Sequence, residues 1–396
     1  MKWASALSTQ PTLALALDET IATIEQALDQ KQAHLLFAFS SCLYGDDIAL
    51  LPKTIAARFN DAVLVGCSGG GIIGATHEIE QGPALTLLAA HLPDVAIKPF
   101  HLEQEAIKQL QETPATLRKR LDCDADQQPC FILLPEPFSC NGEKLIGALD
   151  KAFPGCPKIG GLASGESEAG KHALIINDQI KRKGMVGLAL YGDIEMRPLL
   201  AQGCRPIGAP MIVTNCTNNL LFSLNGQPAT QALDELYASL SKIEQNQFRT
   251  SPHLGLAMLP QQQVLSQGDF LIRNLIGVGR EAGVLAIGAL LEENQTVQFH
   301  LRDPETASAE LHDLLGRYSK RSASQPAAGA LLFSCLGRGK NLFGVDHHDA
   351  SVFAQHTGDV PLSGFFCNGE IGPLHGQTFL HGYTSAFGVF SGRAWS

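Results

Sequence analysis

The chain has 396 residues, of which 45% are hydrophobic and 17% are charged. This length predicts two or three domains with a large core, and the composition excludes disorder over most of the chain. The 29 basic and 39 acidic residues give a net charge of −10, without a long basic run or an apolar stretch that could span a membrane, so we expect neither nucleic acid nor a membrane as a partner.

The ten cysteines are scattered singly, without a C-x-x-C pair. We interpret the N-terminal residues as mature structure, because the polar segment 8–11 interrupts the apolar run that a signal peptide would need. We therefore expect free thiols and a cytoplasmic location. Separately, we expect no cofactor. Asp346-His347-His348-Asp349 contains metal-capable side chains, but adjacent residues rarely share a metal, so we interpret it as a solvated turn and expect no metal site.

Apolar periodicity predicts alternating helices and strands along the chain. The spacing of Leu17, Ile21, Ile24 and Leu28 places four apolar residues on one helical face. Short apolar runs predict buried strands, and other stretches with helical spacing predict further helices. The predicted strands are 35–39, 62–65, 84–90, 131–134, 185–191 and 330–333, and the other predicted helices are 46–59, 145–153, 233–240 and 303–318.

Strand ends and glycine loops recur in the same order, which indicates an internal repeat. The first two copies run into Gly66-Cys67-Ser68-Gly69 and Gly160-Gly161-Leu162, and the third runs into Gly364 to Glu370. We predict an α/β (α+β) fold of mixed or antiparallel sheets packed together with helices outside. We expect two similar domains, 1–202 and 203–396, joined at 202–210 and built from β-α-β-β units at about 30–95, 125–192, 328–392 and, in degenerate form, 250–300.

Gly66-Cys67-Ser68-Gly69-Gly70 matches the G-x-S-x-G pattern of a hydrolase nucleophile elbow. An elbow needs a helix directly after the serine, and consecutive glycines are poor helix formers. The pattern therefore favours a glycine-rich loop between strands over a catalytic serine. The glycine-rich loops do not match either phosphate-binding motif, G-x-G-x-x-G before a helix or G-x-x-x-x-G-K-[ST].

The third unit carries polar side chains at strand ends and in glycine-rich loops. Cys335 and Arg338 follow one predicted strand, Asn368 and Glu370 follow the next, and His381 lies near the end. Arginine offers a planar fork to a carboxylate, and glutamate accepts hydrogen bonds from an amine. Two interpretations stay open: a ligand site with Arg338 and Glu370 as its charged ends, or an internal pair that ties two loops together.

These landmarks resemble the FIST family, which has FIST-N and FIST-C parts. The resemblance covers nearly the whole chain and is strongest after residue 270. It rests on Met1 to Thr9, Val65 to Ser68, Phe270 to Gly288, Val297 to Asp303, Leu332 to Gly339, Pro361 to Pro373 and His381-Gly382. One departure concerns the acidic residue expected after the first glycine loop. Gly71-Ile72-Ile73-Gly74 stands in that place, whereas we expect Glu166 and Glu370 to supply the acid in the second and third units.

The resemblance implies a small-ligand sensor with a signalling partner, and amino acids are one candidate ligand class. The expected ligand-binding residues are Ser68, Gly70, Arg302, Cys335, Arg338, Asn368, Glu370 and His381. Two alternatives belong to other classes: a hydrolase that uses Ser68 or a cysteine as its nucleophile, and an interaction scaffold without a ligand. The sensor is favoured over the hydrolase because no recognisable motif supplies a His–Asp partner.

Overall fold

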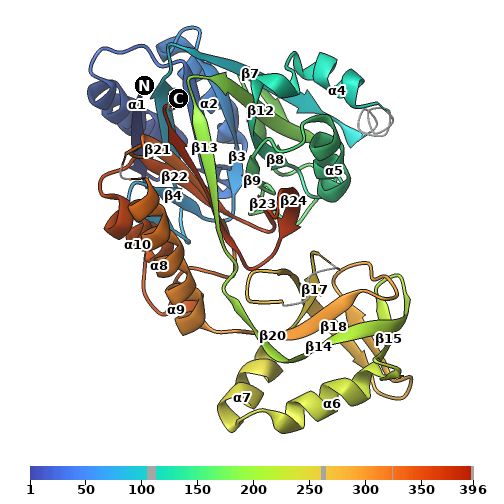
Figure 1. Cartoon of the computed structure of the whole chain (residues 1–396). Coiled ribbons are helices and arrows are strands. Elements are labelled where there is room, and N and C mark those ends of the chain that lie inside the picture. The colour runs from blue at the N-terminus through green and yellow to red at the C-terminus, as the bar shows by residue number, and fades with distance from the viewer. Residues whose placement is uncertain (105–112, 260–264, 323, 394–396) are drawn as a thin grey trace. The chain divides into compact units, whose positions relative to one another are not determined.

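The computed structural model describes residues 1–104, 113–259, 265–322 and 324–393. The chain divides into two compact units (Figure 1). Unit 1 contains residues 1–200, 312–380 and 384–396, and unit 2 contains residues 201–311 and 381–383. Unit 2 is therefore formed mainly by one continuous insertion between two parts of unit 1.

The described residues of unit 1 form three six-stranded sheets. In spatial order, the strands of the first sheet are β1 (Lys2–Ser8), β6 (Leu85–His91), β2 (Leu35–Ser41), β3 (Val63–Gly69), β10 (Leu174–Ile176) and β11 (Gln179–Lys181). Those of the second are β7 (Val95–Leu102), β12 (Met185–Gly192), β8 (Cys130–Pro135), β9 (Lys158–Gly161), β23 (Glu370–Leu374) and β24 (Gln377–His381). Those of the third are β13 (Glu195–Ala201), β25 (Ser385–Ser391), β21 (Gly329–Cys335), β22 (Leu362–Cys367), β4 (Ile72–Gly74) and β5 (His77–Ile79).

The three sheets share one arrangement. Each has a central parallel pair, namely β2–β3, β8–β9 or β21–β22, beside an antiparallel strand that is in turn paired with an edge strand. The other side of each parallel pair binds a short hairpin that comes from a different stretch of the chain. The hairpin β4–β5 joins the third sheet, β10–β11 the first and β23–β24 the second, so the three sheets exchange hairpins in a cycle.

The parallel pairs also share their register. Gly66 lies opposite Ala38, Gly160 opposite Leu133 and Gly364 opposite Leu332. A Cβ atom at these glycines would lie 1.8 to 1.9 Å from the carbonyl oxygen of the opposite residue. Glycine is therefore required at all three positions by the close approach of two backbones.

Helices cover the outer faces of the sheets (Figure 1). Helix α1 follows the predicted apolar spacing, with Leu17, Ile21, Ile24 and Leu28 buried. Helix α5 begins where the Asn141 side chain accepts a hydrogen bond from the Lys144 backbone. The helical elements in the described part of unit 1 are α1 (Leu13–Leu28), η1 (Cys42–Ala49), α2 (Leu50–Arg58), α4 (Pro114–Leu121), η2 (Ala125–Gln127), α5 (Gly142–Ala152), α9 (Lys340–Phe343), α10 (His348–Thr357) and most of α8 (Pro304–Arg321).

The inner faces of the three sheets form one shared core. Phe37 and Phe39 of β2 belong to the same cluster of buried residues as Ile132 of β8 and Phe333 of β21. The ring of Phe39 packs 5.0 Å from Phe365 and 6.3 Å from Phe333, measured between ring centres. The central strands are apolar on both faces because helices cover the side opposite this core.

The described residues of unit 2 form a seven-stranded sheet, two complete helices and the first part of α8. The strands are, in spatial order, β14 (Cys204–Thr217), β20 (Thr296–Arg302), β17 (Pro252–Ala257), β18 (Phe270–Gly279), β19 (Val284–Ile287), β15 (Leu220–Leu224) and β16 (Gln227–Pro228). A further pairing between β14 and β15 closes the sheet on itself. The two complete helices are α6 (Ala229–Ser239) and α7 (Lys242–Thr250).

The predicted mixed α/β fold class is confirmed. The compact units are divided differently from the expected domains 1–202 and 203–396, because nearly all of the expected unit 328–392 lies in unit 1. The expected joint at 202–210 is mostly part of the long strand β14. The expected degenerate unit 250–300 contains strands, but β17 pairs antiparallel with both of its neighbours instead of forming a central parallel pair. No helix in the described part of the chain has the length and apolar character needed to cross a membrane.

Candidate functional site

A polar pocket of about 270 Å³ lies beyond the carboxyl ends of β2 and β3. These parallel strands place Ser40 opposite Ser68 and Ser41 opposite Gly69, and the hairpin strand β10 lies on the other side of β3. The strand ends therefore bring small polar side chains to one edge of the sheet. The pocket is lined by Ser41, Cys42, Asp46, Ser68, Glu166, Lys171 and Arg182, together with Gly45, Ile48, Gly170 and Ala173.

The pocket has a buried polar floor and a charged rim. Ser41 and Ser68 are buried, and the Ser68 hydroxyl accepts a hydrogen bond of 3.1 Å from the Ala173 backbone N–H. Asp46, Glu166 and Lys171 are exposed, and Arg182 is half-buried. Arg182 Nη1 donates to the Lys171 carbonyl over 2.7 Å, which holds the two cationic residues of the rim beside each other. The rim thus offers two cations and two carboxylates.

Cys42 contributes a neutral thiol to this pocket. Burial raises the pKa of Cys42 to about 11, although the neighbouring Ser68 hydroxyl opposes part of that rise. Its Sγ atom donates to the Ser164 carbonyl over 3.3 Å. Because the thiolate is the nucleophilic form, Cys42 is not an activated nucleophile at neutral pH.

Ser68 lies near the end of β3 without the helix that a nucleophile elbow requires. The next element is the strand β4, which begins at Ile72. The Gly70 N–H donates to the Ser164 hydroxyl over 2.9 Å, so this expected ligand-binding group already has a protein partner. The prediction of a glycine-rich loop between strands is confirmed.

Sequence reasoning missed a buried Glu136–His172 pair next to the pocket. Glu136 follows β8 and is fully buried, and its Oε1 lies 2.9 Å from Nδ1 of His172. The Glu166 backbone N–H donates to Nε2 of His172 over 3.3 Å, so the imidazole proton lies on Nδ1 and is donated to the carboxylate. The sequence did contain a signal for this pair: Glu136 directly follows a buried apolar strand, and a buried glutamate needs a polar partner.

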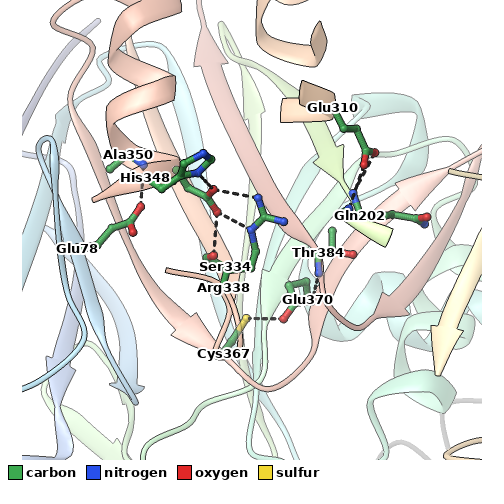
Figure 2. A network of polar contacts seen from close by, with 12 residues as sticks. Glu78, Gln202, Glu310, Ser334, Arg338, His348, Ala350, Cys367, Glu370 and Thr384 are labelled. Atoms are coloured by element: carbon green, nitrogen blue, oxygen red, sulfur yellow. Dashed lines mark hydrogen bonds and ion pairs between the residues drawn. The ribbon is translucent and has the colours of Figure 1, made fainter. Parts of the chain in front are cut away.

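The expected C-terminal cluster forms an interior network in unit 1 (Figure 2). Arg338 is fully buried, and its Nε and Nη2 donate to the two carboxylate oxygens of Asp349 over 2.7 and 2.9 Å. Asp349 also accepts from Ser334 over 3.1 Å and contacts Nδ1 of His348 at 2.9 Å. Burial by itself would raise the pKa of Asp349, but Arg338 and these hydrogen bonds hold it below the usual value.

The interpretation of residues 346–349 as a solvated turn is wrong for the second half of the segment. His348 and Asp349 are buried and begin α10. The physical reason is that Asp349 is the partner of the buried Arg338, and a buried charge requires such a partner.

Glu370 lies in the same network. It is fully buried, and its Oε2 accepts from the Thr384 N–H over 3.0 Å while its Oε1 accepts from the Cys367 thiol over 3.4 Å. Cys335 lies opposite Cys367 in the β21–β22 pair. The Arg338 charge opposes part of the rise in the pKa of Glu370, so the two side chains interact, but neither lines the Ser68 pocket.

The remaining expected residues lie elsewhere. Asn368 is exposed at the turn before β23, and His381 and Arg302 belong to unit 2. The expected correspondence of Glu166 with Glu370 does not hold. Glu370 lies opposite Gly161 and Leu174 lies opposite Cys67, so Leu174 occupies the equivalent place in the first sheet.

Because Glu370 and Glu78 are buried carboxyls, we expect the free energy of unfolding to fall as pH rises. Burial raises the pKa of Glu370 to about 8, and burial together with Asp349 raises the pKa of Glu78 to about 8. Both carboxyls bind protons more tightly in the folded state, so their contribution is complete below about pH 4.5 and is lost as pH rises towards 8. In that window we expect each group to lower the free energy of unfolding by about 1.4 kcal/mol per pH unit.

Denaturant unfolding of the wild type and of Glu370→Gln at several pH values checks this expectation. The variant should show a shallower decline between pH 5 and 8, because glutamine does not titrate. Identical slopes for the two proteins would contradict it.

The mixed α/β fold thus carries, at the ends of two parallel strands, a polar pocket large enough for a small molecule. The FIST N domain matches residues 34–227 and the FIST C domain matches residues 229–373. The chain therefore belongs to the FIST family. FIST domains are associated with small-ligand sensing and signal transduction.

Known proteins are similar to this chain over different lengths. An uncharacterized protein of Mycobacterium tuberculosis is 33% identical over 384 residues, which is 97% of this chain and 98% of the relative. An F-box/LRR-repeat protein of Arabidopsis thaliana is 28% identical over 136 residues, 31% of this chain and 26% of the relative. The structure of a cyanuric acid hydrolase from A. caulinodans aligns over 99% of this chain and 100% of its own, with a TM-score of 0.34 and 8% identity.

Proposed function

We propose that this chain is a cytoplasmic small-ligand sensor, that it binds an amino acid in the Ser68 pocket and that it passes the signal to a separate protein. Membership of the FIST family supports the sensory role. The observation that carries the choice of site is the combination of a hydroxyl-bearing floor with two cations and two carboxylates on the rim. The volume of about 270 Å³ is near the lower end of small-molecule pockets.

The rim is complementary to a zwitterion. Lys171 and Arg182 can bind a carboxylate through charge-assisted hydrogen bonds, and Asp46 and Glu166 can accept hydrogen bonds from an ammonium group. A ligand with only one of these charges would leave half of the rim unmatched. The pocket lies at the ends of parallel strands, where side chains from several strands converge on a ligand.

The hydrolase alternative has less support. The Ser68 hydroxyl already accepts from Ala173, and no histidine hydrogen bond to it occurs among the described residues. His172 is oriented by Glu136 as a catalytic histidine would be, but its Nε2 accepts from a backbone N–H. The thiol of Cys42 is neutral at pH 7 because burial raises its pKa to about 11.

The sensor predicts that free amino acids stabilise the protein against heat. A ligand that binds only the folded state raises the melting temperature, by an amount that corresponds to about 2.7 kcal/mol at a concentration of 100 Kd. We expect Lys171→Gln and Glu166→Gln each to weaken the amino acid that binds the wild type by tenfold or more, because each removes one charge-assisted contact. A thermal-shift screen of the free amino acids, followed by calorimetric titration, measures this effect.

Matched compounds and a matched variant make the test specific. The amino acid amide lacks the carboxylate and the N-acetyl derivative lacks the ammonium, so both should bind more weakly than the parent. Lys53→Gln removes an exposed charge from α2, outside the pocket, and should leave binding unchanged. The proposal is overturned if no free amino acid shifts the melting temperature, or if Lys171→Gln and Glu166→Gln retain the full shift.

A further inference from the structure

Arg302 of unit 2 has a guanidinium edge without a partner. Its Nε and Nη2 atoms are buried and form no hydrogen bond within the described part of the chain. Arg302 is the last residue of β20, opposite Cys204 of β14, and its guanidinium carbon lies 4.9 Å from the ring centre of Tyr383. The Arg302 side chain as a whole is half-buried and always charged, and its two buried donor atoms have no carboxylate bonded to them.

Other arginines of the protein show what this edge binds. In unit 2, Nη2 of Arg205 pairs with Glu244 at 3.0 Å and its Nε pairs with Asp303 at 3.4 Å. In unit 1, the same two atoms of Arg338, Nε and Nη2, hold both carboxylate oxygens of Asp349. The unoccupied edge of Arg302 therefore matches the geometry of a side-on carboxylate contact.

A second polar group without a partner lies beside Arg302. His253 of β17 is 1% exposed, and its Nδ1 forms no hydrogen bond within the described residues. Its ring centre lies 4.3 Å from that of Tyr383, so one aromatic ring contacts both residues. Burial, with a further contribution from the Arg302 charge, lowers the pKa of His253 to about 4, and the imidazole is neutral at pH 7.

We propose that Arg302 is the receptor for the carboxylate of a small organic acid, and that His253 Nδ1 is a second polar contact for it. The net charge of Arg302 and His253 favours a carboxylate over a phosphate. Arg302 supplies one positive charge and the neutral His253 supplies none, so one carboxylate neutralises the cluster, whereas a phosphate dianion would leave a buried negative charge. This site lies within unit 2 and does not depend on the Ser68 pocket of unit 1.

Tyr383 provides a route for the ligand to reach the buried edge. Its φ angle is +64°, which is an unfavourable left-handed conformation for an aromatic residue. A change of this backbone to a more favourable conformation would move the ring off the guanidinium. The ligand can then replace the ring-to-cation contact with two charge-assisted hydrogen bonds.

Calorimetric titration and thermal unfolding of the full chain with sodium acetate test the proposal. Sodium chloride at equal ionic strength, acetamide and inorganic phosphate are the comparison solutes. We expect acetate to raise the melting temperature of the wild type more than any of the three. Arg302→Met should abolish this difference, and Arg302→Lys should weaken acetate binding at least tenfold, because lysine keeps the charge but lacks the fork.

The unliganded variants separate a receptor from a packing residue. Methionine can keep the packing against Tyr383 and removes two buried donors that lack hydrogen bonds, so the melting temperature of Arg302→Met should equal that of the wild type or be higher. Arg280→Met removes an exposed, paired arginine of the same unit and should retain the full acetate effect. Acetate acting no better than chloride on the wild type overturns the proposal, and so does a full acetate effect in Arg302→Met. If Arg302→Met does not fold, an unweakened Arg302→Lys overturns it. Acetate lacks an ammonium group, so its failure would leave the amino acid proposal for the Ser68 pocket intact.

Discussion

Gly160→Ala is expected to destabilise the protein by more than about 4 kcal/mol or to prevent folding. A Cβ atom at Gly160 would lie 1.8 Å from the carbonyl oxygen of Leu133 and 2.8 Å from its carbonyl carbon. Both contacts are with the backbone of Leu133, the residue opposite Gly160 in the β8–β9 pair, so neither strand can move away without breaking its register. Urea unfolding of the purified variant, or its yield of soluble protein, measures the effect.

Gly66 and Gly364 make the equivalent contacts at 1.9 and 1.8 Å, so alanine should be equally disruptive at both positions. Gly147→Ala is the matched control. Gly147 lies inside α5, and nothing lies within 4 Å of its added Cβ, so alanine should stabilise the protein by about 0.5–1 kcal/mol through helix propensity. A Gly160→Ala protein that unfolds within about 1 kcal/mol of the wild type would contradict the expectation.

Some of the fold could be predicted because burial leaves a clear pattern in the sequence. The runs 35–39, 131–134 and 330–333 are apolar throughout, since these central strands are covered on both faces, and all three are strands. The edge strand β7 was missed, because most of its residues are only partly buried and its sequence has no clear periodicity. The exchange of hairpins between sheets could not be predicted, because β4, β10 and β23 are too short to specify a partner by their own sequence.

At the candidate site, too, local motifs could be predicted from the sequence, whereas contacts between distant segments could not. Ser68 was predicted from a local glycine motif, and it lines the pocket. Lys171 and Arg182 come from the segment around the β10–β11 hairpin, so their approach to Ser68 depends on a pairing more than 100 residues apart in sequence. The partner of Arg338 was missed for a different reason. Asp349 lies in a polar-looking segment, and polarity alone does not distinguish a solvated turn from the counter-charge of a buried arginine.

Arg338→Met is expected to destabilise the protein by about 3–5 kcal/mol, because it leaves the carboxylate of Asp349 buried without its charged partner. The wild-type pair lowers the pKa of Asp349, so its stabilising contribution is complete above the unfolded-state pKa of about 4 and declines as pH falls below it. The deficit of the variant should therefore be largest at neutral pH and should shrink in acid, where its Asp349 becomes protonated.

Two comparisons isolate the contribution of the buried charge. Adding Asp349→Leu to Arg338→Met removes both charges and should recover most of the lost stability, as expected when a buried pair is replaced by apolar residues. Arg58→Met breaks an ion pair with Glu25 in which the two side chains are 54% and 39% exposed, and it should cost less than about 1 kcal/mol. Denaturant unfolding of these proteins at neutral and acid pH, with Asp349→Leu alone completing the double-mutant cycle, gives the coupling energy directly. A stable Arg338→Met protein that loses the response to an amino acid would instead restore Arg338 as a ligand-binding residue and contradict its assignment to the interior network.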